Sequence, residues 1–223
     1  SHDLSLRLAP LVLADLLPAA GGRIEGELGV RGPADAPGLS ADVRGEALAL
    51  AGFEAATLTL RGSLPVAGDA GELALRASGL ALGGVDADTL SVDARGSRAS
   101  LALQASARGR HGEVALDGRV GETANGVEGE LANLRLVPST GPTLVLQAPA
   151  AFRASASLLR IERACLRAGD TAGRLCAEAD GNTVSVQGEA LPLALAAPWL
   201  PADDGLPLSV DGMLALQATL ERG

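Results

Sequence analysis

The chain has 223 residues, a formal net charge of -9 and a hydrophobic fraction of 47%, while only 1% of its residues are aromatic. At this charge we expect neither a nucleic-acid interface, which needs clustered Lys or Arg, nor flat docking on an anionic membrane leaflet. The longest apolar run, residues 8–17, is broken by Pro10 and Asp15 and is too short for a membrane-spanning helix.

Residues Ser1 and His2 resemble an expression scar, and we exclude them from the expected fold. The remaining residues, 3–223, are expected to form one elongated domain cut from a longer chain. Residues 8–18 (LAPLVLADLLP) and 191–201 (LPLALAAPWLP) have the same length and the same Leu-Pro ending. We interpret both as short amphipathic helices that cover an open edge of the hydrophobic interior. Membrane insertion is the alternative role.

Apolar and polar residues alternate over most of the chain, which is typical of half-buried strands. Clear cases are residues 23–31, 89–95, 113–117 and 183–187, and Gly or Pro follows such runs about every ten residues. This pattern predicts an all-β fold: a meander of antiparallel strands with one apolar face and one polar face.

Two segments repeat at an offset of 32 residues. Residues 48–60 read LALAGFEAATLTL and residues 80–92 read LALGGVDADTLSV, and a weaker copy begins at Leu134. Each copy is interpreted as a short strand, a tight turn and a longer strand. A hairpin cannot bury its own face, so successive copies are expected to stack over a shared interior.

The two cysteines, Cys165 and Cys176, are separated by ten residues that include Gly169 and Gly173. Two strands that fold back at this turn would bring the sulfur atoms opposite each other, within reach of a disulfide. A hairpin disulfide is favoured over a pair of buried thiols, and it would indicate an oxidising compartment outside the cytosol.

Catalysis is not expected, and neither is a metal ion or another cofactor. His111 is the only histidine outside the first two residues, in a polar turn between two predicted strands. One histidine and two cysteines are too few for a His/Cys metal site of the usual kind. Asp86, Asp88, Asp203 and Asp204 are expected at turns, where Asp favours local backbone hydrogen bonds.

Two patterns of residues occur in a characteristic order. Residues 26–32 (GELGVRG) lead through Pro37 into residues 39–43 (LSADV). Residues 164–188 carry the cysteine hairpin and continue into residues 191–201. The first pattern resembles the unit of strand, Gly, loop, Pro and strand of the TamB and AsmA-like family, and the second resembles the middle of TamB chains.

The resemblance implies a periplasmic protein of a Gram-negative bacterium, with the full-length chain anchored in the inner membrane. It implies a long curled sheet, the β-taco, whose apolar groove carries phospholipid acyl chains or hydrophobic β-strand clients. It also implies an Omp85-family barrel partner, TamA, and a part in autotransporter and outer-membrane protein assembly. A secreted β-solenoid adhesin is the alternative, and nucleic acid is not an expected partner.

The residues themselves also favour a groove, because a curled apolar face without aromatic side chains leaves space for acyl chains. A dry core made of the same residues is the alternative. The candidate lining residues are Ile24, Leu28, Val30, Leu58, Leu60, Leu73, Leu75, Leu90, Val92, Leu101, Leu103, Val114, Leu116, Val184 and Val186.

Overall fold

The computed structural model describes residues 2–33, 37–64, 70–82, 85–155, 158–195 and 212–221. The chain divides into two compact units, Ser1–Arg110 (unit 1) and His111–Gly223 (unit 2). Each unit has its own hydrophobic core. The single elongated domain over residues 3–223 stays a prediction, and so does the separate origin of Ser1 and His2.

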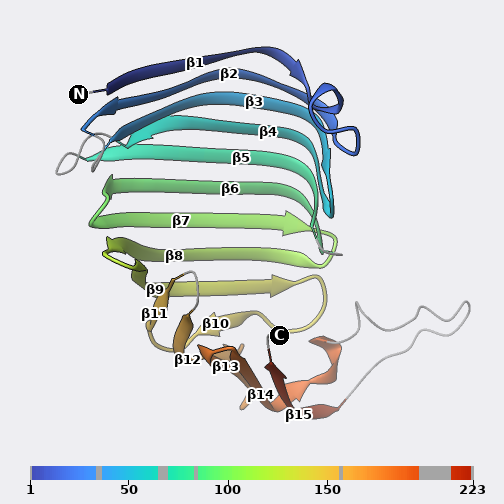
Figure 1. Cartoon of the computed structure of the whole chain (residues 1–223). Coiled ribbons are helices and arrows are strands. Elements are labelled where there is room, and N and C mark those ends of the chain that lie inside the picture. The colour runs from blue at the N-terminus through green and yellow to red at the C-terminus, as the bar shows by residue number, and fades with distance from the viewer. Residues whose placement is uncertain are drawn as a thin grey trace, which may run out of the picture. The chain divides into compact units, whose positions relative to one another are not determined.

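Unit 1 is an antiparallel meander in which each strand pairs with the next one along the chain. The strands lie side by side in sequence order (Figure 1). Their bounds are β1 (His2–Val12), β2 (Gly21–Gly32), β3 (Gly38–Leu50), β4 (Phe53–Leu64), β5 (Gly71–Leu82), β6 (Val85–Ser97) and β7 (Ser100–Gly109).

Unit 2 is also antiparallel. Its strands are β8 (Gly112–Thr123), β9 (Gly126–Pro138), β10 (Leu144–Leu146), β11 (Ala150–Ala154), β12 (Leu159–Ala168), β13 (Arg174–Gly181), β14 (Thr183–Pro192) and β15 (Met213–Glu221). The two short strands β10 and β11 each pair with both β9 and β12. The predicted all-β antiparallel fold is therefore confirmed, and this pairing is unlike the parallel coils of a β-helix.

The helix expected over residues 8–18 is wrong. Residues as far as Val12 belong to β1, and only a short 3-10 turn, η1 (Leu13–Asp15), follows. Leu8 pairs with Gly26 and Leu11 with Ile24, with a register shift between them. Ladder pairing with β2 thus overrides local helix propensity, and the bulge on this edge strand accommodates Pro10, which has no N–H to donate.

The second expected helix, over residues 191–201, lies largely outside the described residues. Its first two residues, Leu191 and Pro192, end β14, where they pair with Leu214 and Met213. Residues 193–195 form a turn of 3-10 helix. The part that the structure describes is therefore a strand end followed by a tight turn.

A line of unpaired residues crosses β3 to β6 in unit 1. The cross-strand pairs on either side of this line are regular, but four residues on it have no partner: Ala47, Ala56, Gly79 and Asp88. Ala47 and Gly79 have left-handed backbones, with φ of 48° and 57°. The strands keep their register across this line, so no extra residue is inserted in β3 to β6, and the strand ends of unit 1 turn sharply in Figure 1. Ala47 and Gly79 are 32 residues apart, and so are Ala56 and Asp88. The 32-residue sequence repeat therefore corresponds to two hairpins that bend at the same place.

Unit 2 contains a second copy of the Ala47 bend. The tetrapeptide Gly-Glu-Ala-Leu occurs at residues 45–48 and again at 188–191. Ala190 has φ 47°, matching Ala47, and the following leucines, Leu48 and Leu191, are buried. Each leucine folds over the glycine three residues before it, since a Cβ at Gly45 would lie 2.7 Å from Leu48 Cδ1 and one at Gly188 2.6 Å from Leu191 Cδ1.

These bends position the small core of each unit. In unit 1, Leu48 packs with Leu13, Ala20 and Ala55. In unit 2, Leu191 packs with Leu144, Leu166 and Ala168. Both cores therefore form where bent strand ends close over the apolar face.

Candidate functional site

The apolar face of unit 1 can be followed row by row, because residues directly opposite each other in a sheet have their side chains on the same face. Three such rows cross all seven strands, and none of them contains a polar side chain. The rows are Leu6, Leu28, Ala41, Gly62, Leu73, Ala94 and Leu103; then Leu8, Gly26, Val43, Leu60, Leu75, Val92 and Ala105; then Leu11, Ile24, Gly45, Leu58, Ala77, Leu90 and Ala107.

Unit 2 presents a comparable face. One row crosses β8, β9 and β11 to β15 and consists of Val120, Gly129, Phe152, Ile161, Ala179, Val184 and Leu220. A second runs from Leu146 through Leu166, Leu175 and Gly188 to Leu216. These rows combine leucine, valine and isoleucine with glycine and alanine, and Phe152 is their single aromatic residue.

All fifteen predicted lining residues lie on the apolar face of their own unit. Eleven belong to unit 1: Ile24, Leu28, Val30, Leu58, Leu60, Leu73, Leu75, Leu90, Val92, Leu101 and Leu103. The other four, Val114, Leu116, Val184 and Val186, belong to unit 2. That they line a groove stays a prediction. Only the strand register reveals the further members of this face, which were not predicted from the sequence: Leu8, Leu11, Val43, Leu136, Leu175 and the small residues between the leucines.

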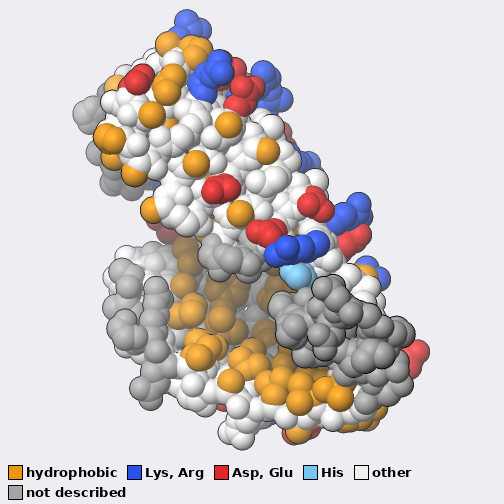
Figure 2. Space-filling model, turned by 90° about the vertical axis from the view of Figure 1, so that its right-hand side faces the viewer, with side chains coloured by type: hydrophobic (Ala, Val, Ile, Leu, Met, Phe, Trp, Pro, Cys, Tyr) orange, Lys and Arg blue, Asp and Glu red, His pale blue; other side chains and the backbone are white. Residues whose placement is uncertain are grey.

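The apolar face is incompletely covered. In unit 1 the side chains of Leu4, Leu6, Leu28 and Leu39 are 65%, 53%, 36% and 43% exposed, equivalent together to about two fully exposed leucines. Within the described part of the chain, no bulky side chain is fully buried. Figure 2 shows a field of hydrophobic side chains at the surface in the lower half of the view, where unit 2 lies. A packed core would bury these residues, so this face stays partly open to solvent.

The opposite face is charged and carries a ladder of ion pairs. Seven arginines pair with carboxylates directly across neighbouring strands: Arg7 with Glu27, Arg31 with Asp3, Arg61 with Asp42, Arg95 with Glu72, Arg153 with Glu128, Arg160 with Asp180 and Arg174 with Glu189. All of them are exposed to water, where each such pair contributes little to stability. Together they show which face of each sheet is the solvated one.

A comparison with known protein families assigns the chain to one of them. The model described as the N-terminal domain of TamB matches residues 1–221. The chain belongs to the TamB family. Membership supports a part in the translocation and assembly module. The matching model describes the N-terminal domain, whereas the cysteine hairpin was compared above with the middle of TamB chains. No curated protein and no solved structure gives a significant match.

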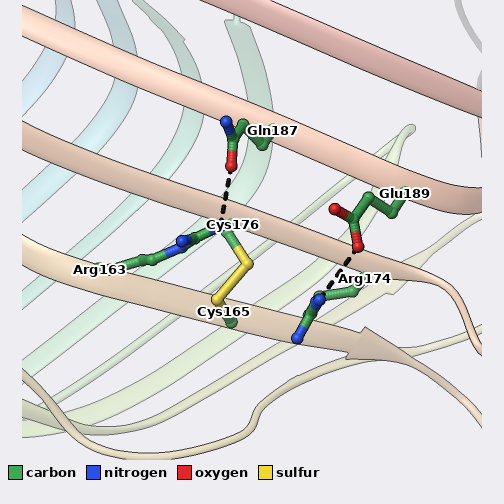
Figure 3. The surroundings of a disulfide bond; sticks show 6 residues. All are labelled: Arg163, Cys165, Arg174, Cys176, Gln187 and Glu189. Carbon is green, nitrogen blue, oxygen red and sulfur yellow. Dashed lines mark hydrogen bonds and ion pairs between the residues drawn. A yellow bond between two sulfur atoms is a disulfide. The ribbon is translucent and has the colours of Figure 1, made fainter.

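The cysteine hairpin of this TamB-family chain closes as a disulfide. Cys165 on β12 lies directly opposite Cys176 on β13, and the structure joins their sulfur atoms (Figure 3). The bond lies on the charged face, yet Cys176 is only 4% exposed. Arg163 donates a hydrogen bond from Nη2 to Gln187 Oε1 at 2.8 Å, which lays both side chains beside the bond.

Among the described residues of this TamB-family chain, no group of three or more His, Cys, Asp and Glu side chains is suitably placed for a metal ion. His111 lies in the turn before β8 and is half-buried. No helix within the described ranges has the length and hydropathy needed to cross a membrane.

Proposed function

We propose that this chain is a non-catalytic periplasmic segment of the translocation and assembly module, whose apolar face conducts phospholipid acyl chains between the inner and outer membranes. One observation carries the proposal: seven strands of unit 1 present unbroken apolar rows whose leucines stay partly exposed. A soluble domain rarely leaves such a surface open without an apolar ligand.

The dimensions of unit 1 suit a lipid tail. Neighbouring strands lie about 4.8 Å apart, so a row across seven strands is roughly 29 Å long. A lipid tail spans half of a hydrocarbon core that is about 30 Å thick. One row of unit 1 is therefore long enough to hold a full acyl chain, and the Gly and Ala positions provide space between the leucines.

The chemistry of the other face supports the location, and the family resemblance suggests the partners. A disulfide such as Cys165–Cys176 is favoured in an oxidising compartment, which fits the periplasm. The ion-pair ladder is suited to water on that side. The family resemblance adds an inner-membrane anchor and a TamA-type barrel for the full-length protein. It also adds hydrophobic β-strand clients in autotransporter and outer-membrane protein assembly.

Adjacent residues on β7 provide a matched test. Leu103 lies in an apolar row opposite Ala94, and Gln104 lies on the charged face opposite Asp93. We expect Leu103→Arg to keep a near-normal melting temperature, because on an open face the guanidinium can reach water. It should nevertheless fail to complement a strain that lacks the full-length protein. Gln104→Arg, which adds the same charge opposite a carboxylate, should complement normally.

Two results would contradict the proposal. Gross unfolding of Leu103→Arg would indicate a dry core, where an unpaired charge costs several kcal/mol. Full complementation by a stable Leu103→Arg variant would remove the apolar face from the mechanism.

A further inference from the structure

One row on the charged face of unit 2 departs from the ion-pair ladder. It runs from Arg135 on β9 through Val145 on β10 to Arg167 on β12 and Arg174 on β13. Only Arg174 has a carboxylate beside it, Glu189, at 3.0 Å. We call Arg135, Val145, Arg167 and Arg174 the arginine row.

The positive charges of the arginine row are not all neutralised by carboxylates, in contrast to the ion-pair ladder on the rest of the charged face. Arg135 faces Ala115 and Val145, and Arg167 faces Val145 and Arg174. Among the described residues neither Arg135 nor Arg167 forms an ion pair. Like charges directly opposite each other are destabilising in a sheet. A chain with a net charge of -9 thus keeps two exposed arginines without carboxylates opposite them.

The row is also narrow. On one side it is flanked by uncharged residues, namely Asn133, the disulfide, Gln187 and Gln217. Two carboxylates, Glu113 and Asp117, lie diagonally from Arg135 on β8. Beyond the uncharged residues come Glu130, Glu178 and Asp180.

We propose that the arginine row binds an extended acidic segment of a partner protein. Such a segment can follow one row and place carboxylates at Arg135 and at the adjacent Arg167 and Arg174, with Val145, 46% exposed, as an apolar contact between them. A flat anionic bilayer is disfavoured, because it would also press against the flanking carboxylates. The row spans about 14 Å, three strand spacings, which matches about four extended residues.

A defined peptide tests this proposal. The probe is a fluorescein-labelled decapeptide of alternating Glu and Ser, titrated with the whole chain by fluorescence anisotropy in 20 mM NaCl. The double variant Arg135→Gln/Arg167→Gln should weaken binding about tenfold, which corresponds to two exposed ion pairs. Its melting temperature should not fall, because Arg167→Gln also removes the repulsion with Arg174. Raising the salt to 200 mM should weaken binding of the original chain.

Matched controls test whether binding depends on the arginine row itself or only on the charge of the chain. Arg160→Gln removes an arginine that is paired with Asp180 on the same face, and it should leave the affinity unchanged. A peptide of alternating Gln and Ser should not bind. The proposal is overturned if the original chain does not bind the acidic peptide, or if the double variant binds it as tightly. It is also overturned if vesicles containing phosphatidylglycerol bind to the row while the acidic peptide does not.

Discussion

The bend at Ala47 gives a stability prediction that does not depend on function. Ala47 has φ 48°, in the left-handed region, and its side chain is exposed. Replacing it with glycine should therefore stabilise the chain, because glycine adopts this backbone without steric strain and little buried surface is lost. Ala102 on β7 is also exposed but its φ is not positive, so Ala102→Gly is the matched control.

The magnitude follows from two opposing effects. An L-residue in the left-handed region costs about 1–2 kcal/mol, and glycine in a strand costs about 0.5–1 kcal/mol through the entropy of the unfolded chain. Ala47→Gly should thus raise the free energy of unfolding by about 0.5–1 kcal/mol, and Ala102→Gly should lower it by a similar amount. Ala47→Val should lower it by more than 1 kcal/mol, since a β-branched side chain is poorly accommodated at positive φ.

Urea denaturation followed by circular dichroism measures these differences. The slope of the unfolding free energy against urea concentration should stay the same in all variants, so that a change in midpoint reports stability. If Ala47→Gly destabilises the chain as much as Ala102→Gly does, the left-handed bend is refuted, and with it our explanation of the 32-residue repeat.

Three further predictions concern the disulfide, the glycines and the ion pairs. Non-reducing mass spectrometry of periplasmically expressed protein should show Cys165 bonded to Cys176, and two free thiols would refute the bond. Replacing both cysteines with alanine should lower the free energy of unfolding by about 3 kcal/mol without abolishing the fold. Loss of the β-sheet signal in far-ultraviolet circular dichroism would contradict this prediction. Gly62→Ala should destabilise by at least about 2 kcal/mol, because φ is 135° and the new Cβ would clash with the Glu72 carbonyl oxygen. Gly52→Ala, with nothing within 4 Å, should cost clearly less, and equal losses in urea denaturation would argue against the close approach. A double-mutant cycle on Arg160 and Asp180, both exposed, should give a coupling below about 1 kcal/mol that falls with added salt; a larger, salt-independent value would refute simple surface pairing.

The sequence was sufficient to predict the strands and the face to which each apolar residue belongs. Alternation is a local property, so the inward positions of Leu28, Leu60 and Leu103 could be read directly from the chain. The cysteine hairpin was equally local, because its two strands share one tight turn.

The bends and the edge strand could not be predicted in the same way. The alternation reverses at Ala47, and nothing in an alanine marks a left-handed backbone; the repeated Gly-Glu-Ala-Leu was the available signal. Residues 8–18 carry a helix-like composition, but pairing with β2 decides their structure. The arginine row depends on which strands lie side by side, since Arg135 and Arg167 are 32 residues apart in the sequence and separated in space only by β10.

The central claim, that the apolar face holds lipid, is tested most directly by counting phospholipid on the purified chain. The chain and the two variants Leu103→Arg and Gln104→Arg would be expressed in the periplasm, separated by size exclusion, extracted with organic solvent and analysed by mass spectrometry. The account predicts that phospholipid copurifies with the original chain and with Gln104→Arg, and that it is strongly reduced in Leu103→Arg. Phospholipid at the same low level in all three proteins would contradict the claim.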